Sequence, residues 1–68
     1  MTTYLTNAQH SAAKAALTRA KKKGPEAVIQ EVTARFQTWD DDDVAYPDSW
    51  HDWVRASFDA KTTLLYQR

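Results

Sequence analysis

The sequence predicts a small all-α protein, a three-helix bundle, and three observations support this fold class. The 68 residues include only one glycine and two prolines, and these fall where helices should begin or end. Apolar residues recur at helical spacing in three segments, and the connections between the segments are short. The predicted helices cover about residues 6–23, 25–39 and 48–66, within a single helical domain of residues 1–68. The alternative is a helical hairpin that buries its aromatic side chains in a homodimer, because so short a chain has a small core.

The first predicted helix begins at a capping box. In the stretch TNAQ, residues 6–9, the Thr6 oxygen can accept from a helix amide while the Gln9 side chain reaches back. The lysines at 21–23 suit the negative end of the helix dipole, and Gly24 is typical of the residue after a helix. The apolar side of this helix is wide and consists mostly of alanine: Ala8, Ala12, Ala13, Ala15, Ala16, Leu17 and Ala20.

The second helix gives the strongest structural signal. Pro25 suits the first turn of a helix, where its missing N–H does no harm, and Glu26 complements the positive end of the dipole. Glu31 and Arg35 are spaced to form a pair on one flank. Four consecutive aspartates, at 40–43, should end this helix, because they repel one another and face the negative end of its dipole. A core-facing stripe follows helical spacing: Val28, Ile29, Val32, Phe36 and Trp39.

The third helix has two possible starts. Pro47 can occupy the first turn, or Ser49 can cap the helix with Asp52 three residues later. Lys61 lies within the apolar side of this helix, where it either extends its charge to the edge or marks a place that a partner covers. The large side chains predicted to line that side, with Ser57 in the same arc, are Trp50, Trp53, Val54, Phe58, Leu64 and Leu65.

Composition excludes several classes of protein. The chain contains no cysteine, which excludes disulfides and thiolate metal sites and favours a reduced, intracellular setting. The N-terminal stretch MTTYLTNAQH lacks the basic and apolar regions of a signal peptide, and no apolar run approaches the ~20 residues of a membrane span. We therefore expect a soluble, cytoplasmic protein without a membrane partner.

The formal net charge is zero, but the charges are segregated along the chain. Residues 1–25 carry five basic side chains and no acid, a net of +5, and the remainder carries nine acids against four bases, a net of −5. Such asymmetry can indicate a polyelectrolyte partner or head-to-tail self-association. Alternatively, the two charged parts face each other within the fold.

No metal or cofactor site is predicted. If Asp40 began a calcium-binding EF-hand loop, Val44, Ala45 and His51 would occupy three positions where the motif requires other residues. Zinc would need three or four ligands, and neither His10 nor His51 has a histidine partner one helical turn away. We expect both histidines on the surface, His10 on the exposed side of the first turn of its helix.

The sequence also lacks the motifs of an enzyme. The serines at 11, 49 and 57 have no nucleophile-elbow motif, and a single glycine excludes a glycine-rich phosphate loop. Paired catalytic carboxylates require a cleft, which a helical bundle of this size can hardly provide. The prediction is a non-enzymatic protein.

The acidic stretch is the leading candidate for a site. Six aspartates lie within thirteen residues, without a base among them and beside two aromatic residues. Aromatic side chains can anchor a partner, while carboxylates speed the encounter with a basic surface. Such a surface includes the nucleic-acid groove of another protein, in which carboxylates would take the place of phosphates. The alternative is that the tryptophans belong to the core and the aspartates form a solvated turn. The predicted partner-binding residues are Asp40, Asp41, Asp42, Asp43, Tyr46, Asp48, Trp50 and Asp52.

Direct nucleic-acid binding is the alternative function. A basic helix end can contact phosphates, but it can equally serve to complement the helix dipole. The third helix starts among acids, which is untypical of a recognition helix. The candidate residues for this function are Lys14, Arg19, Lys21, Lys22 and Lys23.

In size, helical composition and the stretch WDDDDVAYPD, residues 39–48, the chain resembles the short, cysteine-free accessory proteins of bacteriophages and mobile elements, among them inhibitors of the anti-CRISPR type. The resemblance implies stoichiometric binding to a host macromolecule in place of catalysis. The basic first helix departs from a uniformly acidic nucleic-acid mimic. We therefore predict a binding protein that regulates or inhibits a host macromolecule through the acidic loop and the start of the third helix.

Overall fold

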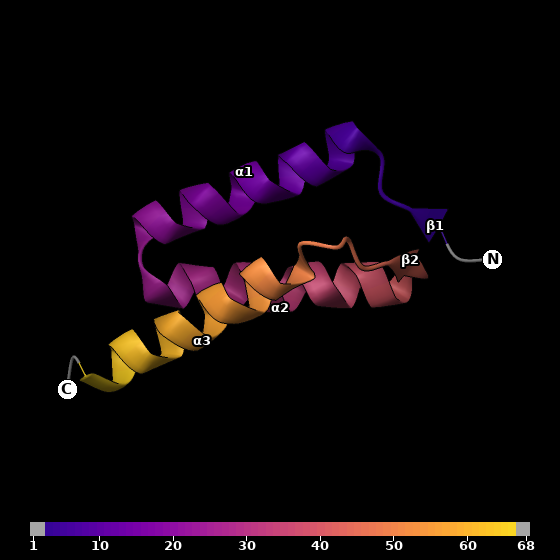
Figure 1. The fold of residues 1–68 in the computed structure, drawn as a ribbon. Coiled ribbons are helices and arrows are strands. Elements are labelled where there is room, and N and C mark those ends of the chain that lie inside the picture. Colours follow the sequence, from indigo (N-terminus) through magenta and orange to yellow (C-terminus); the bar gives the residue numbers. More distant parts are fainter. Residues whose placement is uncertain (1–2, 67–68) are drawn as a thin grey trace.

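The computed structural model describes residues 3–66, and this part of the chain forms three helices: α1 (Asn7–Lys23), α2 (Pro25–Asp41) and α3 (Trp50–Tyr66). Figure 1 shows α1 and α3 running in the same direction and α2 running opposite to them. The helix α2 packs against both of the others. The Cα trace is elongated, with extents of 45 × 18 × 17 Å. The predicted all-α three-helix bundle is confirmed.

The ends of α1 follow the sequence signals. The Gln9 amide donates to Thr6 Oγ1 at 3.1 Å and the Thr6 amide donates to Gln9 Oε1 at 2.9 Å, so the capping box is complete. At the other end, the Gly24 amide donates to the Ala20 carbonyl at 3.1 Å. Gly24 has φ 132°, a left-handed conformation that favours glycine. Pro25 begins α2 directly afterwards, which makes the predicted tight turn between the two helices.

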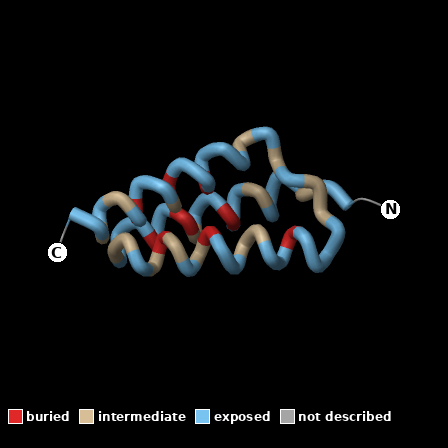
Figure 2. The backbone as a smooth tube through the Cα atoms, turned by 90° about the horizontal axis from the view of Figure 1, so that it is seen from below, coloured by how far each residue is buried: buried red, intermediate tan, exposed pale blue. Residues whose placement is uncertain are grey.

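The core is formed by all three helices. In Figure 2, buried positions recur as short red segments along helices that are otherwise exposed. The stripe predicted on α2 is confirmed, because Val28, Val32 and Trp39 are buried while Ile29 and Phe36 pack against the core in part. Within residues 3–66, the buried hydrophobic residues are Ala13, Leu17, Ala20, Val28, Val32, Trp39, Trp53, Ala56 and Ala60.

The buried side of α3 differs from the prediction. Trp53, Ala56 and Ala60 are buried, whereas Val54 and Phe58, expected in the core, are exposed. Leu65 and Trp50 also lie on the exposed side of α3. The side of α3 that packs against the bundle carries Ala56 and Ala60, whose small side chains let the helix backbones approach closely. Trp53, on the same side, is fully buried. Of the six large side chains predicted to line the core side, that of Trp53 is buried, that of Leu64 is half-buried and the other four are exposed.

Two helix boundaries also differ. The helix α2 continues to Asp41, past the predicted end at residue 39, because the Asp42 amide still donates to the Thr38 carbonyl at 3.0 Å. Asp43 then turns the chain with φ 54°. The helix α3 begins at Trp50 instead of residue 48, and the Trp50 amide donates to the Pro47 carbonyl at 2.9 Å in the turn before it.

A short parallel strand pair was not predicted. The strand β1 (Thr3–Tyr4) pairs with β2 (Val44–Ala45), and the Thr3 amide donates to the Asp43 carbonyl at 2.9 Å. Strands of two residues carry no periodic pattern that a sequence can reveal. The pair ties the start of the described chain to the turn that follows α2.

Among residues 3–66, no helix is both long enough and apolar enough to cross a membrane.

Candidate partner-binding surface

The four consecutive aspartates form an exposed turn at the end of α2. Asp40 and Asp41 lie in the last turn of the helix, and Asp42 and Asp43 follow it. All four side chains are exposed to solvent. The acidic turn therefore faces solvent.

Tyr46 folds back over this acidic turn. Its hydroxyl donates to Asp40 Oδ1 at 2.5 Å, and its ring centroid lies 5.0 Å from that of Phe36 and 5.8 Å from that of Trp39. The ring is still 40% exposed. Contacts on one side hold Tyr46 in place, so its other side is presented to solvent in a fixed orientation.

The contact with Asp40 also affects the ionisation of Tyr46. The hydrogen bond to the Asp40 carboxylate raises the pKa of Tyr46, with smaller contributions in the same direction from burial and from the negative charge of Asp40. Loss of the phenol proton would remove the hydrogen bond and place two negative charges side by side.

The other predicted residues lie around the start of α3. Asp48 is exposed, and Trp50 is 36% exposed with its ring centroid 3.9 Å from that of His51. Asp52 is exposed in the first turn of the helix. Within residues 3–66, no hydrogen bond or ring contact joins Tyr46 to these residues. The eight predicted residues thus form two neighbouring groups along the chain, one at the acidic turn, where Tyr46 donates to Asp40, and one around the start of α3.

Five of the six aspartates form no ion pair within the described residues. Among the described residues, no ion pair involves Asp40, Asp41, Asp42, Asp48 or Asp52, whereas Glu31 and Arg35 form the predicted pair at 2.7 Å. The charge of these five aspartates remains available to a partner.

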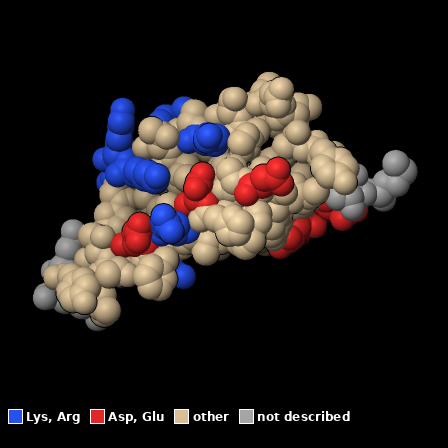
Figure 3. Space-filling model, in the orientation of Figure 1, with Lys and Arg blue, Asp and Glu red and all other residues tan. Residues whose placement is uncertain are grey.

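The basic cluster lies at the opposite end of α2. Lys21–Lys23 close α1 beside the start of α2, and the 17 residues of α2, about 25 Å at 1.5 Å per residue, separate them from the acidic turn. In Figure 3, most lysine and arginine side chains gather toward the end where α1 meets α2, whereas acidic side chains lie next to some of them and along the rest of this face. The acidic turn therefore does not face the basic end of α1, although Asp52 on α3 lies across a groove from Lys14 and Lys21. All five basic candidates are exposed: Lys14, Arg19, Lys21, Lys22 and Lys23.

His10 makes a contact that the sequence did not predict. The expectation that His10 lies on the exposed side of α1 is wrong, because it is partly buried, its Nε2 lies 2.7 Å from Ser49 Oγ, and its ring centroid lies 6.0 Å from that of Trp53. No third group among residues 3–66 forms a hydrogen bond with the His10 ring, as a catalytic triad would require. The pair joins α1 to the residue before α3. Residues 39 positions apart give no sequence signal for such a contact.

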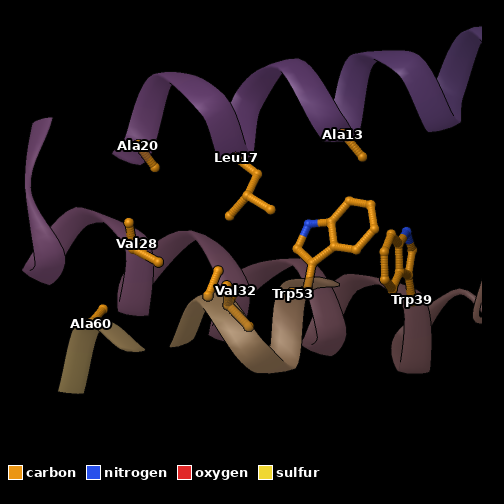
Figure 4. Close-up of a cluster of buried hydrophobic side chains, with 9 residues drawn as sticks. Ala13, Leu17, Ala20, Val28, Val32, Trp39, Trp53 and Ala60 are labelled. Carbon is orange, nitrogen blue, oxygen red and sulfur yellow. The ribbon is translucent and has the colours of Figure 1, made fainter. Parts of the chain in front are cut away.

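An open groove runs between α1 and α3. Its volume is about 550 Å³, its floor includes Leu17 and Trp53, and its edges carry Lys14 and Lys21 on α1 and Asp52 on α3. The expectation that so small a bundle can hardly provide a cleft is therefore wrong. Figure 4 shows the indole nitrogen of Trp53 on the side of the ring that faces Leu17, and this nitrogen is buried without a hydrogen-bond partner.

In the part of the chain that the structure describes, no three side chains among histidine, cysteine, aspartate and glutamate are grouped to hold a metal ion. Clustering of aspartates in the sequence thus does not produce a convergent set of ligands.

Comparison with known proteins gives no relative for this chain. No protein-family model matches it, and neither the curated proteins nor the solved structures include a significant match. The likeness to small phage inhibitors therefore stays a prediction.

Proposed function

We propose that this chain is a non-enzymatic binding protein that regulates or inhibits a host macromolecule in the cytoplasm. It would do so through an acidic surface, defined as Asp40–Asp43, Tyr46, Asp48, Trp50 and Asp52. One observation carries the proposal: five exposed aspartates, which form no ion pair within residues 3–66, lie beside two partly exposed aromatic rings. These five are Asp40, Asp41, Asp42, Asp48 and Asp52.

The position of the aspartates supports a role in binding. Asp40 and Asp41 lie in the last turn of α2, where the negative end of the helix dipole makes a carboxylate unfavourable by about 0.3–1 kcal/mol. Mutual repulsion adds to this effect. A local arrangement that opposes folding is expected at functional sites. A basic partner would reduce both the repulsion among the carboxylates and their unfavourable interaction with the helix dipole.

The proposed partner is a protein with a basic surface, such as one that binds nucleic acid. Carboxylates accelerate the encounter with such a surface, whereas desolvated aromatic rings contribute more of the final affinity. Tyr46 and Trp50 are the anchors, and Tyr46 is already held by Asp40 and by the rings of Phe36 and Trp39.

A second candidate function is direct nucleic-acid binding through the basic cluster of Lys14, Arg19 and Lys21–Lys23. The observation that favours it is the exposure of all five side chains along α1, with three of them in the last turn, away from the acidic turn. Each phosphate contact would make the affinity fall more steeply with salt. Undetectable binding to DNA and RNA at low salt would exclude this function.

The test compares three versions of the chain as bait in a host lysate: the native chain, a variant with Asp40–Asp43 changed to asparagine, and a control with Lys21–Lys23 changed to glutamine. Asparagine suits these positions because it tolerates the left-handed conformation of Asp43 and still offers Tyr46 an acceptor at residue 40. Circular dichroism first establishes that each variant is folded.

The proposal predicts that a protein is retained by the native chain and by the lysine variant but is lost from the asparagine variant. Equal retention by all three versions contradicts it. Retention of nucleic acid that is lost only from the lysine variant would favour the second function.

A further inference from the structure

The helix α3 has a second apolar face that the core does not use. Four side chains, Trp50, Val54, Phe58 and Leu65, are 36%, 45%, 69% and 67% exposed. At 100° per residue they lie within an arc of about 80°, together with Lys61, which is also exposed. We call these five residues the outer face of α3. Since Trp53, Ala56 and Ala60 are buried on another side, this helix is apolar on two sides.

The size of the outer face is that of an interaction surface. At the observed exposed fractions, its four apolar side chains present roughly 400 Å², given that an aromatic side chain carries about 150–250 Å². Tyr66, which is 82% exposed at the end of the same helix, adds further apolar area. The apolar area alone is about half of the ~800 Å² per partner of a stable interface, so the polar side chains that flank the outer face must supply the remainder.

We infer that the outer face binds a second copy of this chain, with the two α3 helices packed antiparallel about a twofold axis between residues 57 and 58. In this register, Trp50 of one copy lies opposite Leu65 of the other, and Phe58 lies opposite Ser57. Large side chains meet smaller ones, and every contact occurs twice, as a twofold interface requires.

Lys61 distinguishes this arrangement from a parallel one. The antiparallel register places Lys61 opposite Val54, so that its aliphatic stem covers an apolar residue while its amine reaches the edge. A parallel pair would bring Lys61 against Lys61 of the other copy in the middle of the interface, and like charges that face each other are unfavourable. Antiparallel packing also places the positive end of each helix dipole beside the negative end of the other, which is favourable.

This inference does not rest on the proposed function. Trp50 belongs to both surfaces, so the test uses Phe58 and Leu65, which lie outside the acidic surface. Loss of dimerisation in a Phe58 variant would leave the aspartates intact, and loss of partner binding in the asparagine variant would leave the outer face intact.

The first experiment measures the molar mass by sedimentation equilibrium over a range of concentrations. The native chain should reach the mass of a dimer, and Phe58→Asp should raise the dissociation constant at least about tenfold, as expected for an anchor residue. Tyr4→Asp is the control, because Tyr4 is a 75% exposed aromatic residue outside the outer face. A native monomer at every concentration, or a dimer that Phe58→Asp does not weaken, overturns the inference.

The second experiment tests the register, using the absence of cysteine from the native chain. Ser57→Cys lies next to the twofold axis and should form a disulfide-linked dimer on mild oxidation. Leu65→Cys should not, because the two copies of residue 65 would lie about 22 Å apart along the helix axis. Crosslinking of Leu65→Cys under the same conditions would overturn the antiparallel arrangement.

Discussion

Trp53 holds the three helices together, and its truncation should be the most damaging single change in the chain. The side chain is 0% exposed and extends from α3 toward α1 and α2. Its ring lies edge-on to that of Trp39, with the centroids 5.5 Å apart, and near that of His10. Trp53→Ala would leave a cavity among all three helices.

The expected magnitude is large for so small a protein. Replacing a buried tryptophan by alanine costs about 3–5 kcal/mol. The change also removes an indole N–H that has no hydrogen-bond partner, and an unpaired buried donor is itself unfavourable by about 1–3 kcal/mol. The net loss should therefore fall near 3 kcal/mol. At 0.05–0.15 kcal/mol per residue, a chain of 68 residues has a total stability of only about 3–10 kcal/mol.

The assay is urea denaturation followed by far-ultraviolet circular dichroism, at a concentration where sedimentation finds a monomer. Trp50→Ala is the matched control, because it makes the same change three residues earlier on the same helix, at a position that is 36% exposed. Trp53→Ala should be largely unfolded or lose roughly 3 kcal/mol, and Trp50→Ala about 1 kcal/mol or less. If the control were as damaging as Trp53→Ala, the assignment of the buried side of α3 would be wrong.

Three further predictions concern local features. Thr6→Ala should lower the free energy of unfolding by about 1 kcal/mol through loss of the cap on α1, while Thr6→Ser, which keeps a hydroxyl, should lose much less in the same urea titration. Gly24→Ala should cost about 1–2 kcal/mol by thermal denaturation, because φ is 132° there although the space around the position is open; an unchanged midpoint would contradict this strain. The raised pKa of Tyr46 means that its stabilising contribution is complete below the pKa of an unfolded tyrosine, near 10, and is lost as the pH rises through the folded value. Asp40→Ala, which removes the acceptor, should therefore move the phenolate absorbance transition of Tyr46, identified with Tyr46→Phe, to lower pH; no movement would contradict the contact.

Much of the fold could be predicted because its signals are local. The capping box at Thr6 and the turn at Gly24 depend on residues that are neighbours in the sequence. All the large apolar residues of α2 lie in one stripe on one side of the helix, so only that side could face the core.

The buried side of α3 could not be predicted in the same way. The helix has two apolar sides, and the one with the larger exposed residues, Phe58 and Leu65, points away from the bundle. The choice depends on how closely Ala56 and Ala60 let α3 approach α2, which is a property of the packed structure.

The candidate site was predictable in its charge but not in its contacts. The exposure of the aspartates follows from their number and position at a helix end. The hydrogen bond from Tyr46 to Asp40 and the His10–Ser49 contact depend on how the chain turns after α2. Neither has a sequence pattern, because both join segments that only the folded chain brings together.

The most direct test of the acidic surface is the affinity of the captured partner, once purified, for the native chain and for the variant with Asp40–Asp43 changed to asparagine, measured by calorimetry at several salt concentrations. Exposed charge pairs contribute about 0.2–1 kcal/mol each, so the loss of four should weaken binding by roughly 4- to 900-fold. The salt dependence should become shallower in the variant. An affinity and a salt dependence equal to those of the native chain would contradict the proposed role of the acidic surface.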